Sequence, residues 1–146
     1  MRLIDGGVTA SEGFFAAGIA CGIKKNGKKD LAIVCSEDIA AAAGVFTTNI
    51  VKGHSLQVTM EHIKSGYATA IVINSGNANA CVGEQGYRDA KEIAEITAQY
   101  LECMPENILV GSTGVIGVPL NMEVIRPAIE DLVSNMSPDG GHDASE

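Results

Sequence analysis

Tryptophan is absent from this chain of 146 residues, and only three tyrosines and three phenylalanines are present. The core must therefore be built from aliphatic side chains and alanine. Basic residues are also scarce: 10 Lys and Arg stand against 18 Asp and Glu, which gives a net charge of −8 at pH 7. Because a nucleic-acid-binding surface needs a basic patch that displaces counterions, we expect no nucleic-acid partner.

Long hydrophobic runs are missing as well. No stretch reaches the ~18 apolar residues that a membrane-spanning helix needs, and residues 1–7 lack the apolar core of a signal peptide. We therefore expect a cytoplasmic protein that does not bind membranes.

The chain has four cysteines, and they show no paired short spacing. They are Cys21, Cys35, Cys81 and Cys103. Neither a CxxC metal site nor a disulfide framework is predicted from this pattern, and we expect buried, reduced thiols. The acidic residues fall mostly on predicted helix faces and form no cluster of metal ligands. The sequence thus predicts no metal and no cofactor.

Apolar residues make up 46% of the chain, which is enough to form the core of a single domain. We predict that residues 1–136 form one α/β domain. Residues 137–146 have no hydrophobic periodicity and are predicted to be a flexible tail or linker.

The first third of the chain has the alternation that is typical of antiparallel strands, around residues 19–23 and 31–35. Asn26–Gly27 between them predicts a tight hairpin turn with positive φ at both residues. A third strand is predicted at residues 42–48, because Gly44 and the β-branched and aromatic residues after it favour strand over helix.

Helical spacing of apolar residues predicts a long helix over residues 86–102. A short helix is predicted over residues 59–65, capped by Thr59 and closed by Gly66 in the left-handed conformation. A last helix is predicted to begin at about Arg126, because proline at the next position fits best in a first turn.

Two further strands are predicted at residues 68–74 and 108–110, so that helices and strands alternate in the second half of the chain. The fold class expected from this order is α/β (α+β), with a mixed β-sheet and helices packed on it.

The run Asn74-Ser75-Gly76-Asn77-Ala78-Asn79-Ala80-Cys81 follows a predicted strand and precedes the long helix. Asparagine and glycine accept left-handed backbone conformations, and asparagine side chains satisfy nearby backbone groups. Buried amides must find partners, so we expect a connected network. We predict structural support of a site by Asn74, Ser75, Gly76, Asn77 and Asn79.

A second polar run, Gly111-Ser112-Thr113-Gly114-Val115-Ile116-Gly117, follows the next predicted strand. A tight loop of small residues can present N–H groups into a cavity, and Thr113 adds a hydroxyl donor. Such donors stabilise the negative oxygen that forms during acyl transfer. From local sequence alone, a plain turn between a strand and a helix is the preferred interpretation of the run, because glycine-rich turns are common.

Cys81 is a second candidate for chemistry, as a nucleophile in a turn. A cysteine nucleophile needs a base and a lowered pKa. The three imidazoles, His54, His62 and His142, show no spacing that pairs them with Cys81. A buried, packed thiol is therefore the preferred interpretation of Cys81.

The two polar runs, together with Gly7–Ala10, Gly13–Phe14 and Val45–Asn49, resemble the amino-terminal part of ornithine acetyltransferase, also called glutamate N-acetyltransferase, of arginine biosynthesis. This resemblance implies the α-chain part of an amino-terminal-nucleophile-like acetyltransferase fold. It also implies that Thr113 and Gly114 form an oxyanion hole. The nucleophilic threonine and the substrate-binding residues of the family are expected beyond Glu146.

The resemblance further implies an enzyme that moves the acetyl group from N-acetylornithine to glutamate through an acetyl-threonine intermediate. Some family members also use acetyl-CoA. The precursor cleaves itself into α and β chains, and an α2β2 assembly is implied. Two alternatives from other classes are a cysteine-dependent hydrolase centred on Cys81 and a non-catalytic small-molecule-binding module.

Overall fold

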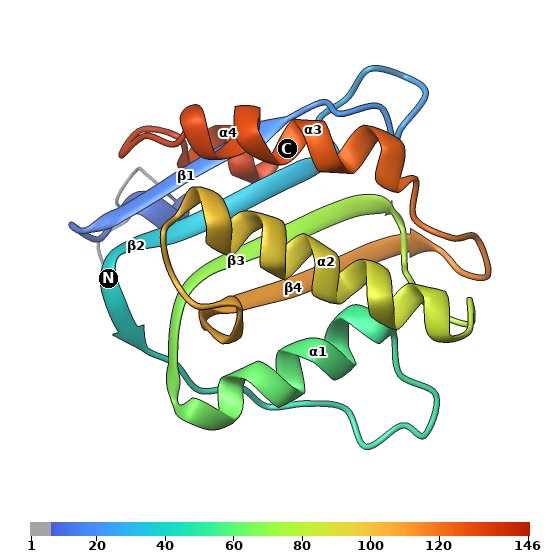
Figure 1. Cartoon of the computed structure of the whole chain (residues 1–146). Helices are drawn as coiled ribbons and strands as arrows, with labels where there is room; N and C mark the ends of the chain where they lie inside the picture. The colour runs from blue at the N-terminus through green and yellow to red at the C-terminus, as the bar shows by residue number, and fades with distance from the viewer. Residues whose placement is uncertain (1–6) are drawn as a thin grey trace, which may run out of the picture.

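A four-stranded sheet with its three longest helices on one face is the framework of residues 7–146, the part of the chain that the computed structural model describes (Figure 1). The strands are β1 (Phe14–Ile19), β2 (Leu31–Ala41), β3 (Tyr67–Asn77) and β4 (Ile108–Val115). The helices are α1 (His54–His62), α2 (Glu84–Tyr100), α3 (Met122–Ser134) and α4 (Gly141–Ser145). Short 3₁₀ turns are η1 (Gly7–Thr9), η2 (Ile63–Ser65) and η3 (Pro105–Asn107).

The sheet is mixed, as predicted, with the order β1-β2-β3-β4. Both β1 with β2 and β2 with β3 are antiparallel, whereas β3 and β4 are parallel and are joined through α2. A crossover helix of this kind is the usual connection between parallel neighbours. It brings the carboxyl ends of β3 and β4 to the same edge of the sheet.

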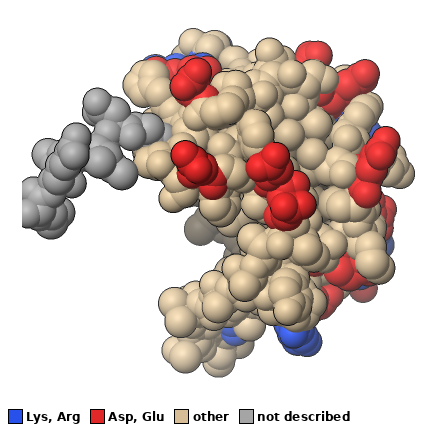
Figure 2. Space-filling view, turned by 90° about the vertical axis from the view of Figure 1, so that its left-hand side faces the viewer, with Lys and Arg blue, Asp and Glu red and all other residues tan. Residues whose placement is uncertain are grey.

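The two faces of the sheet are covered differently. The core lies between one face and the helices α1–α3, where Ile33, Val72 and Val110 are buried with Ala94 and Ile129. On the other face, Ile71 and Ile73 each keep 40% of their surface exposed. Figure 2 shows the molecule hollowed at the left of the view, with acidic side chains on the surface above and to the right of the hollow.

The predicted strand at residues 42–48 is wrong: this segment forms no strand and Val45 is fully exposed. Strand β2 instead continues to Ala41, past a register shift between Cys35 and Ala40. Ala41 pairs with Tyr67, the first residue of β3, so the chain beyond it has passed the end of its neighbour. Without a neighbouring strand, a sequence that favours β structure cannot form a ladder.

The predicted tight hairpin is also wrong, because β1 ends at Ile19 and β2 begins only at Leu31. Positive φ occurs at Gly27 (70°) but not at Asn26. The loop is ordered by Asp30, whose carboxylate accepts hydrogen bonds from the N–H groups of Cys21 (2.7 Å), Gly22 (3.2 Å) and Lys24 (2.7 Å). One buried acceptor therefore replaces the local turn.

Two helices begin earlier than predicted. Helix α1 begins at His54, so Thr59 lies inside it rather than capping it, while Gly66 closes the following turn with φ of 78° as predicted. Helix α3 begins at Met122 and contains Pro127 in its interior. Proline removes one helical hydrogen bond, but Pro127 lies on the exposed side, where water can reach the freed carbonyl.

Residues 137–146 are not the free tail that was predicted. Ser137 and Ala16 exchange two backbone hydrogen bonds of 3.0 Å each, and α4 packs against β1. The contact is so close that a Cβ on Gly18 would overlap the backbone of Asp143. The segment has no periodic pattern of apolar residues because its close contacts with β1 are made by the backbone.

Candidate active site

The two polar runs lie side by side at the carboxyl ends of β3 and β4. The parallel register pairs Asn74 with Ser112, Ser75 with Thr113, Gly76 with Gly114 and Asn77 with Val115. Both strands therefore extend into their polar runs, to Asn77 and Val115, past the ends predicted at residues 74 and 110. The structure thus places Thr113 and Gly114 beside the residues predicted to support them.

Gly76 and Gly114 allow the two strand ends to approach each other closely. Their φ angles are 111° and 133°, which L side chains rarely adopt. A Cβ on Gly114 would overlap the carbonyl carbon of Gly76, and a Cβ on Gly76 would lie 2.7 Å from Cγ2 of Ile23. Glycine is therefore required at both positions of this pair.

Ser112 and Thr113 belong to opposite faces of the sheet, because successive side chains of a strand alternate. The Ser112 hydroxyl lies 2.6 Å from the hydroxyl of Ser55 on α1, on the helix-covered face. Thr113 and Gly114 are exposed. The Thr113 hydroxyl and the Gly114 N–H are thus accessible donors at a strand end whose backbone is held in place.

The asparagines form a network, but it is not the fully connected one that was predicted, because Oδ1 of Asn74 and of Asn79 is buried without a hydrogen-bond partner among the described residues. The Asn74 amide donates to the carbonyl of Asn77 at 3.0 Å, and the Asn77 amide donates to the carbonyls of Val118 and Pro119 at 3.1 and 3.2 Å. Asn79 reaches the start of α2, because its amide donates to the carbonyl of Gly86 at 2.8 Å. The run connects β3 with the loop after β4 and with α2.

Helix α1 covers the free edge of β4 with a row of hydrogen-bonding side chains. Ser55 contacts Ser112, Thr59 bonds both backbone groups of Val110, and the His62 ring lies 2.8 Å from the carbonyl of Ile108. Sequence reasoning did not identify this row. The signal was the helical spacing of three polar side chains on a buried face.

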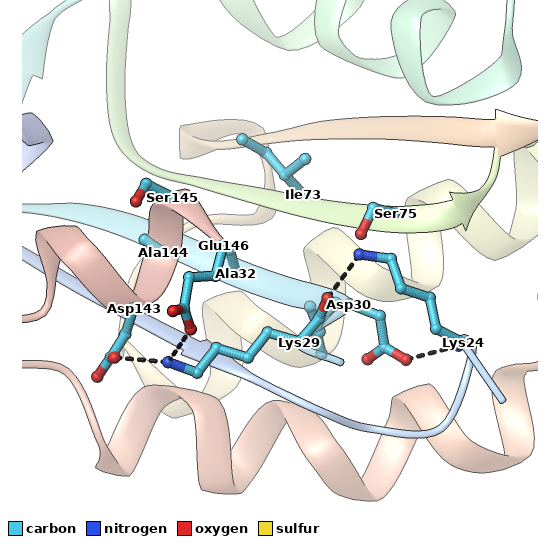
Figure 3. A pocket seen from close by; sticks show the side chains of 11 residues that line it. Lys24, Lys29, Asp30, Ala32, Ile73, Ser75, Asp143, Ala144, Ser145 and Glu146 are labelled. Carbon is cyan, nitrogen blue, oxygen red and sulfur yellow. Dashed lines mark hydrogen bonds and ion pairs between the residues drawn. The ribbon is translucent and has the colours of Figure 1, made fainter. Parts of the chain in front are cut away.

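A pocket of about 230 Å³ opens on the other face, between Ser75 and α4 (Figure 3). Its two lysines are already engaged. Lys29 pairs with the carboxylates of Asp143 and Glu146 (2.9 Å), and the ammonium of Lys24 donates to the carbonyl of Lys29 at 2.7 Å. The ion pairs of Lys29 join α4 to the loop before β2. Each of the two ammonium groups therefore already has a hydrogen-bond partner.

The burial of the cysteines differs from what was expected. All four cysteines are free and Cys35 is buried, but Cys81 is exposed, with a positive φ of 59°. The prediction of a buried Cys81 is therefore wrong, because the strand extends to Asn77 and the following turn lies at the surface. Burial, together with the Asp30 carboxylate, raises the pKa of the Cys21 thiol to about 12.

No imidazole is paired with Cys81 among the described residues. His62 faces Ile108, His142 lies 3.7 Å from Glu146, and the ring nitrogens of His54 are buried without a hydrogen-bond partner. Within residues 7–146, no group of three or more His, Cys, Asp and Glu is placed to hold a metal ion. No helix in that range is long and apolar enough to span a membrane.

Comparisons with known proteins found a matching family model and several relatives. The family model "ArgJ family" matches residues 15–146. The arginine biosynthesis bifunctional protein ArgJ of Caldanaerobacter subterraneus subsp. tengcongensis is 50% identical over 145 residues, which cover 99% of this chain and 36% of that protein. ArgJ of Symbiobacterium thermophilum is 50% identical over 148 residues, covering 100% and 37%.

Two solved structures share the fold. Ornithine acetyltransferase from Mycobacterium tuberculosis, complexed with ornithine, has a TM-score of 0.94 at 41% identity, over 98% of this chain and 79% of that chain. ArgJ from Bacillus halodurans has a TM-score of 0.93 at 38% identity, over 100% and 76%. The chain spans only about a third of the length of the curated relatives. By sequence and by fold, this chain belongs to the ArgJ family.

Proposed function

We propose that this chain is the oxyanion-stabilising α portion of an acetyltransferase that moves an acetyl group from N-acetylornithine to glutamate. One observation carries the proposal: Thr113 and Gly114 are exposed at the end of β4, while the Gly76 contact holds their backbone. Membership of the ArgJ family, whose solved members include an ornithine acetyltransferase, supports the choice of substrates.

In this proposal the nucleophile is a threonine in the part of the relatives that lies beyond Glu146. Its hydroxyl attacks the acetyl carbonyl, and the carbonyl oxygen becomes negative. The Thr113 hydroxyl and the Gly114 N–H donate to that oxygen. The carbonyl then re-forms as the C–N bond breaks, ornithine leaves after its nitrogen takes the proton that the threonine hydroxyl released, and acetyl-threonine remains. The glutamate amine repeats the attack and restores the threonine hydroxyl.

The proposed partner is the remaining, β portion of the same precursor, separated by self-cleavage and assembled as α2β2 in the cytoplasm. The relatives are almost three times as long as this chain, which supports a second portion. Acetyl-CoA is a further candidate acetyl donor, and the substrate-binding residues belong to the β portion. The isolated 146 residues should therefore show no turnover of N-acetylornithine and glutamate.

Thr113→Ala in the complete enzyme tests the proposal. Loss of one donor to the developing oxyanion should lower kcat by roughly 10²-fold or more. KM should change much less, because the interaction forms mainly in the transition state. Thr113→Ser keeps the hydroxyl and should retain more activity.

Ser134→Ala is the matched control, since it removes an exposed hydroxyl at the far end of α3. It should leave both kinetic constants unchanged. A folded Thr113→Ala enzyme with wild-type kcat would remove Thr113 from the oxyanion site. Turnover by the isolated chain would contradict the nucleophile in the β portion, and acetylation of Cys81 would then favour the cysteine-dependent reaction.

A further inference from the structure

A chain of hydrogen bonds leads from the start of α2 to the residue before Thr113. The Asn79 amide donates to the carbonyl of Gly86 at 2.8 Å and to the hydroxyl of Ser55 at 3.2 Å. The Ser55 hydroxyl in turn lies 2.6 Å from that of Ser112. Three elements, α2, α1 and β4, are thus joined through polar side chains next to the exposed strand end.

The direction of these bonds follows from the Gly86 carbonyl. A carbonyl oxygen can only accept, so the Asn79 amide must present its NH₂ group there and cannot be flipped. The same NH₂ group donates to Ser55, so the proton of the Ser55 hydroxyl remains available for Ser112. Asn79 and Ser55 are 0% and 3% exposed, so water cannot replace either partner.

Among the hydrogen bonds from α1 side chains to β4, the Ser55–Ser112 bond is the one nearest the carboxyl end of the strand. Strand β3 flanks β4 on one side as far as Val115, whereas no strand pairs with the other edge within the described residues and α1 lies along it. The row of α1 side chains reaches Ile108, Val110 and Ser112 and then ends. A tilt of the strand end that carries Ser112 away from α1 would stretch this bond and would move the neighbouring Thr113 as well.

We infer that Ser55, oriented by Asn79, is a positioning residue that acts through Ser112 on the donors of Thr113 and Gly114. This inference rests on the proposed function, since it assigns a role toward the oxyanion. Ser55 touches neither substrate nor nucleophile in this scheme. Its effect is to limit the motion of the strand end, and displacements of about 1 Å can lower rates by up to roughly 10²-fold.

The test uses the complete enzyme with Ser55→Ala. We expect kcat to fall about 10-fold and KM to change little, because only transition-state contacts are misplaced. Ser36→Ala is the matched control: Ser36 is a serine of similar burial (7%) in β2, and it donates to the carbonyl of Thr69 at 3.1 Å. This control should lower the melting temperature without lowering kcat.

Combination with Thr113→Ala separates positioning from general stability. If Ser55 acts through Thr113, Ser55→Ala should lower kcat much less in the Thr113→Ala enzyme than in the wild type, whereas its effect on melting temperature should be the same in both. Ser112→Ala removes the same bond from the half-buried partner and should reproduce the kinetic result if Ser55→Ala does not fold.

The outcomes distinguish the two proposals. Suppose that Thr113→Ala lowers kcat. If Ser55→Ala and Ser112→Ala leave kcat unchanged, or if they lower it by the same factor in the Thr113→Ala enzyme as in the wild type, the positioning role is wrong and the oxyanion assignment stands. If Thr113→Ala itself has wild-type kcat, the oxyanion assignment is wrong and the role of Ser55 falls with it.

Discussion

The hydroxyl of Thr59 satisfies both backbone groups of Val110. It donates to the Val110 carbonyl at 2.7 Å and accepts from the Val110 N–H at 2.8 Å. Thr59 thereby occupies the place that a neighbouring strand would take at the edge of β4. An unprotected edge is a template for pairing with another chain, so a helix side chain protects this edge at its most buried residues.

Thr59→Val should destabilise the protein by about 1–3 kcal/mol, because both backbone groups of the buried Val110 lose their partner. The matched control is Thr97→Val in α2. Thr97 is 0% exposed, but its hydroxyl donates to a carbonyl of its own helix, that of Ile93, so less should be lost. Urea unfolding measures the difference, and hydrogen exchange should accelerate at the Val110 amide. Equal losses in both variants would contradict the role of Thr59.

Gly114→Ala should impair the site more than any glycine substitution in the loop that follows. Its Cβ would overlap the backbone of Gly76, so the strands must separate. Gly117→Ala is the control, because Gly117 also has positive φ (77°) but no atom within 4 Å of a Cβ. That variant should cost about 1–2 kcal/mol from backbone strain and keep its kcat. A normal kcat in Gly114→Ala would show that the strand ends need not stay in contact.

Cys81→Ser should leave kcat close to that of the wild type. Cys81 is exposed at a turn, and no described imidazole is hydrogen-bonded to it. Cys81→Gly should be at least as stable as the wild type, because glycine adopts the φ of 59° without strain. Steady-state kinetics and thermal melts check both variants. Loss of the acetyl-enzyme in a folded Cys81→Ser protein would instead make the thiol catalytic.

Asp30→Asn should destabilise the protein at neutral pH and have less effect in acid. Burial disfavours the charged carboxylate, but the N–H groups of Lys24 and Cys21 more than offset this and hold the pKa of Asp30 below its usual value. A carboxyl with a depressed folded pKa stabilises the protein above its unfolded pKa, about 3.9. That stabilisation disappears as the pH falls through the folded pKa.

Unfolding of the wild type and Asp30→Asn at pH 7 and at pH 3 measures this linkage. We expect a difference of about 1.5–3 kcal/mol at pH 7, typical of hydrogen bonds to a charged group, and a smaller one at pH 3. Asp38→Asn, which changes an exposed carboxylate, should have little effect at either pH. A difference that is constant with pH would mean that the charge of Asp30 is irrelevant to the loop.

The mixed sheet and the long helix could be predicted because their signals are local. The apolar spacing of α2 and the alternation in β2 reflect burial on one face. The end of β2 and the packing of residues 137–146 could not be predicted. They depend on where a neighbouring strand ends and on backbone contacts with Gly18. Neither produces a periodic spacing of apolar residues in the sequence.

The site was partly predictable for the same reason. Small and polar residues at 74–81 and 111–117 indicated unusual backbone, and φ is positive at Gly76, Asn79 and Gly114. The close contact of Gly76 with Gly114 was not predicted. Their adjacency depends on the parallel pairing of β3 with β4, which local sequence does not encode. Ser55 was missed because a serine on a helix is ordinary until its partner is known.

The alternation that separates Ser112 from Thr113 also restricts how this family can change over time. Inserting or deleting one residue between Val110 and Ser112 would exchange the two faces, turning the threonine toward α1 and the serine toward the open side. Point substitutions could accumulate along β4, but a change of its length by one residue would remove the hydroxyl from the open face. Natural variation in length should therefore collect in the segment 116–121 and spare the strand.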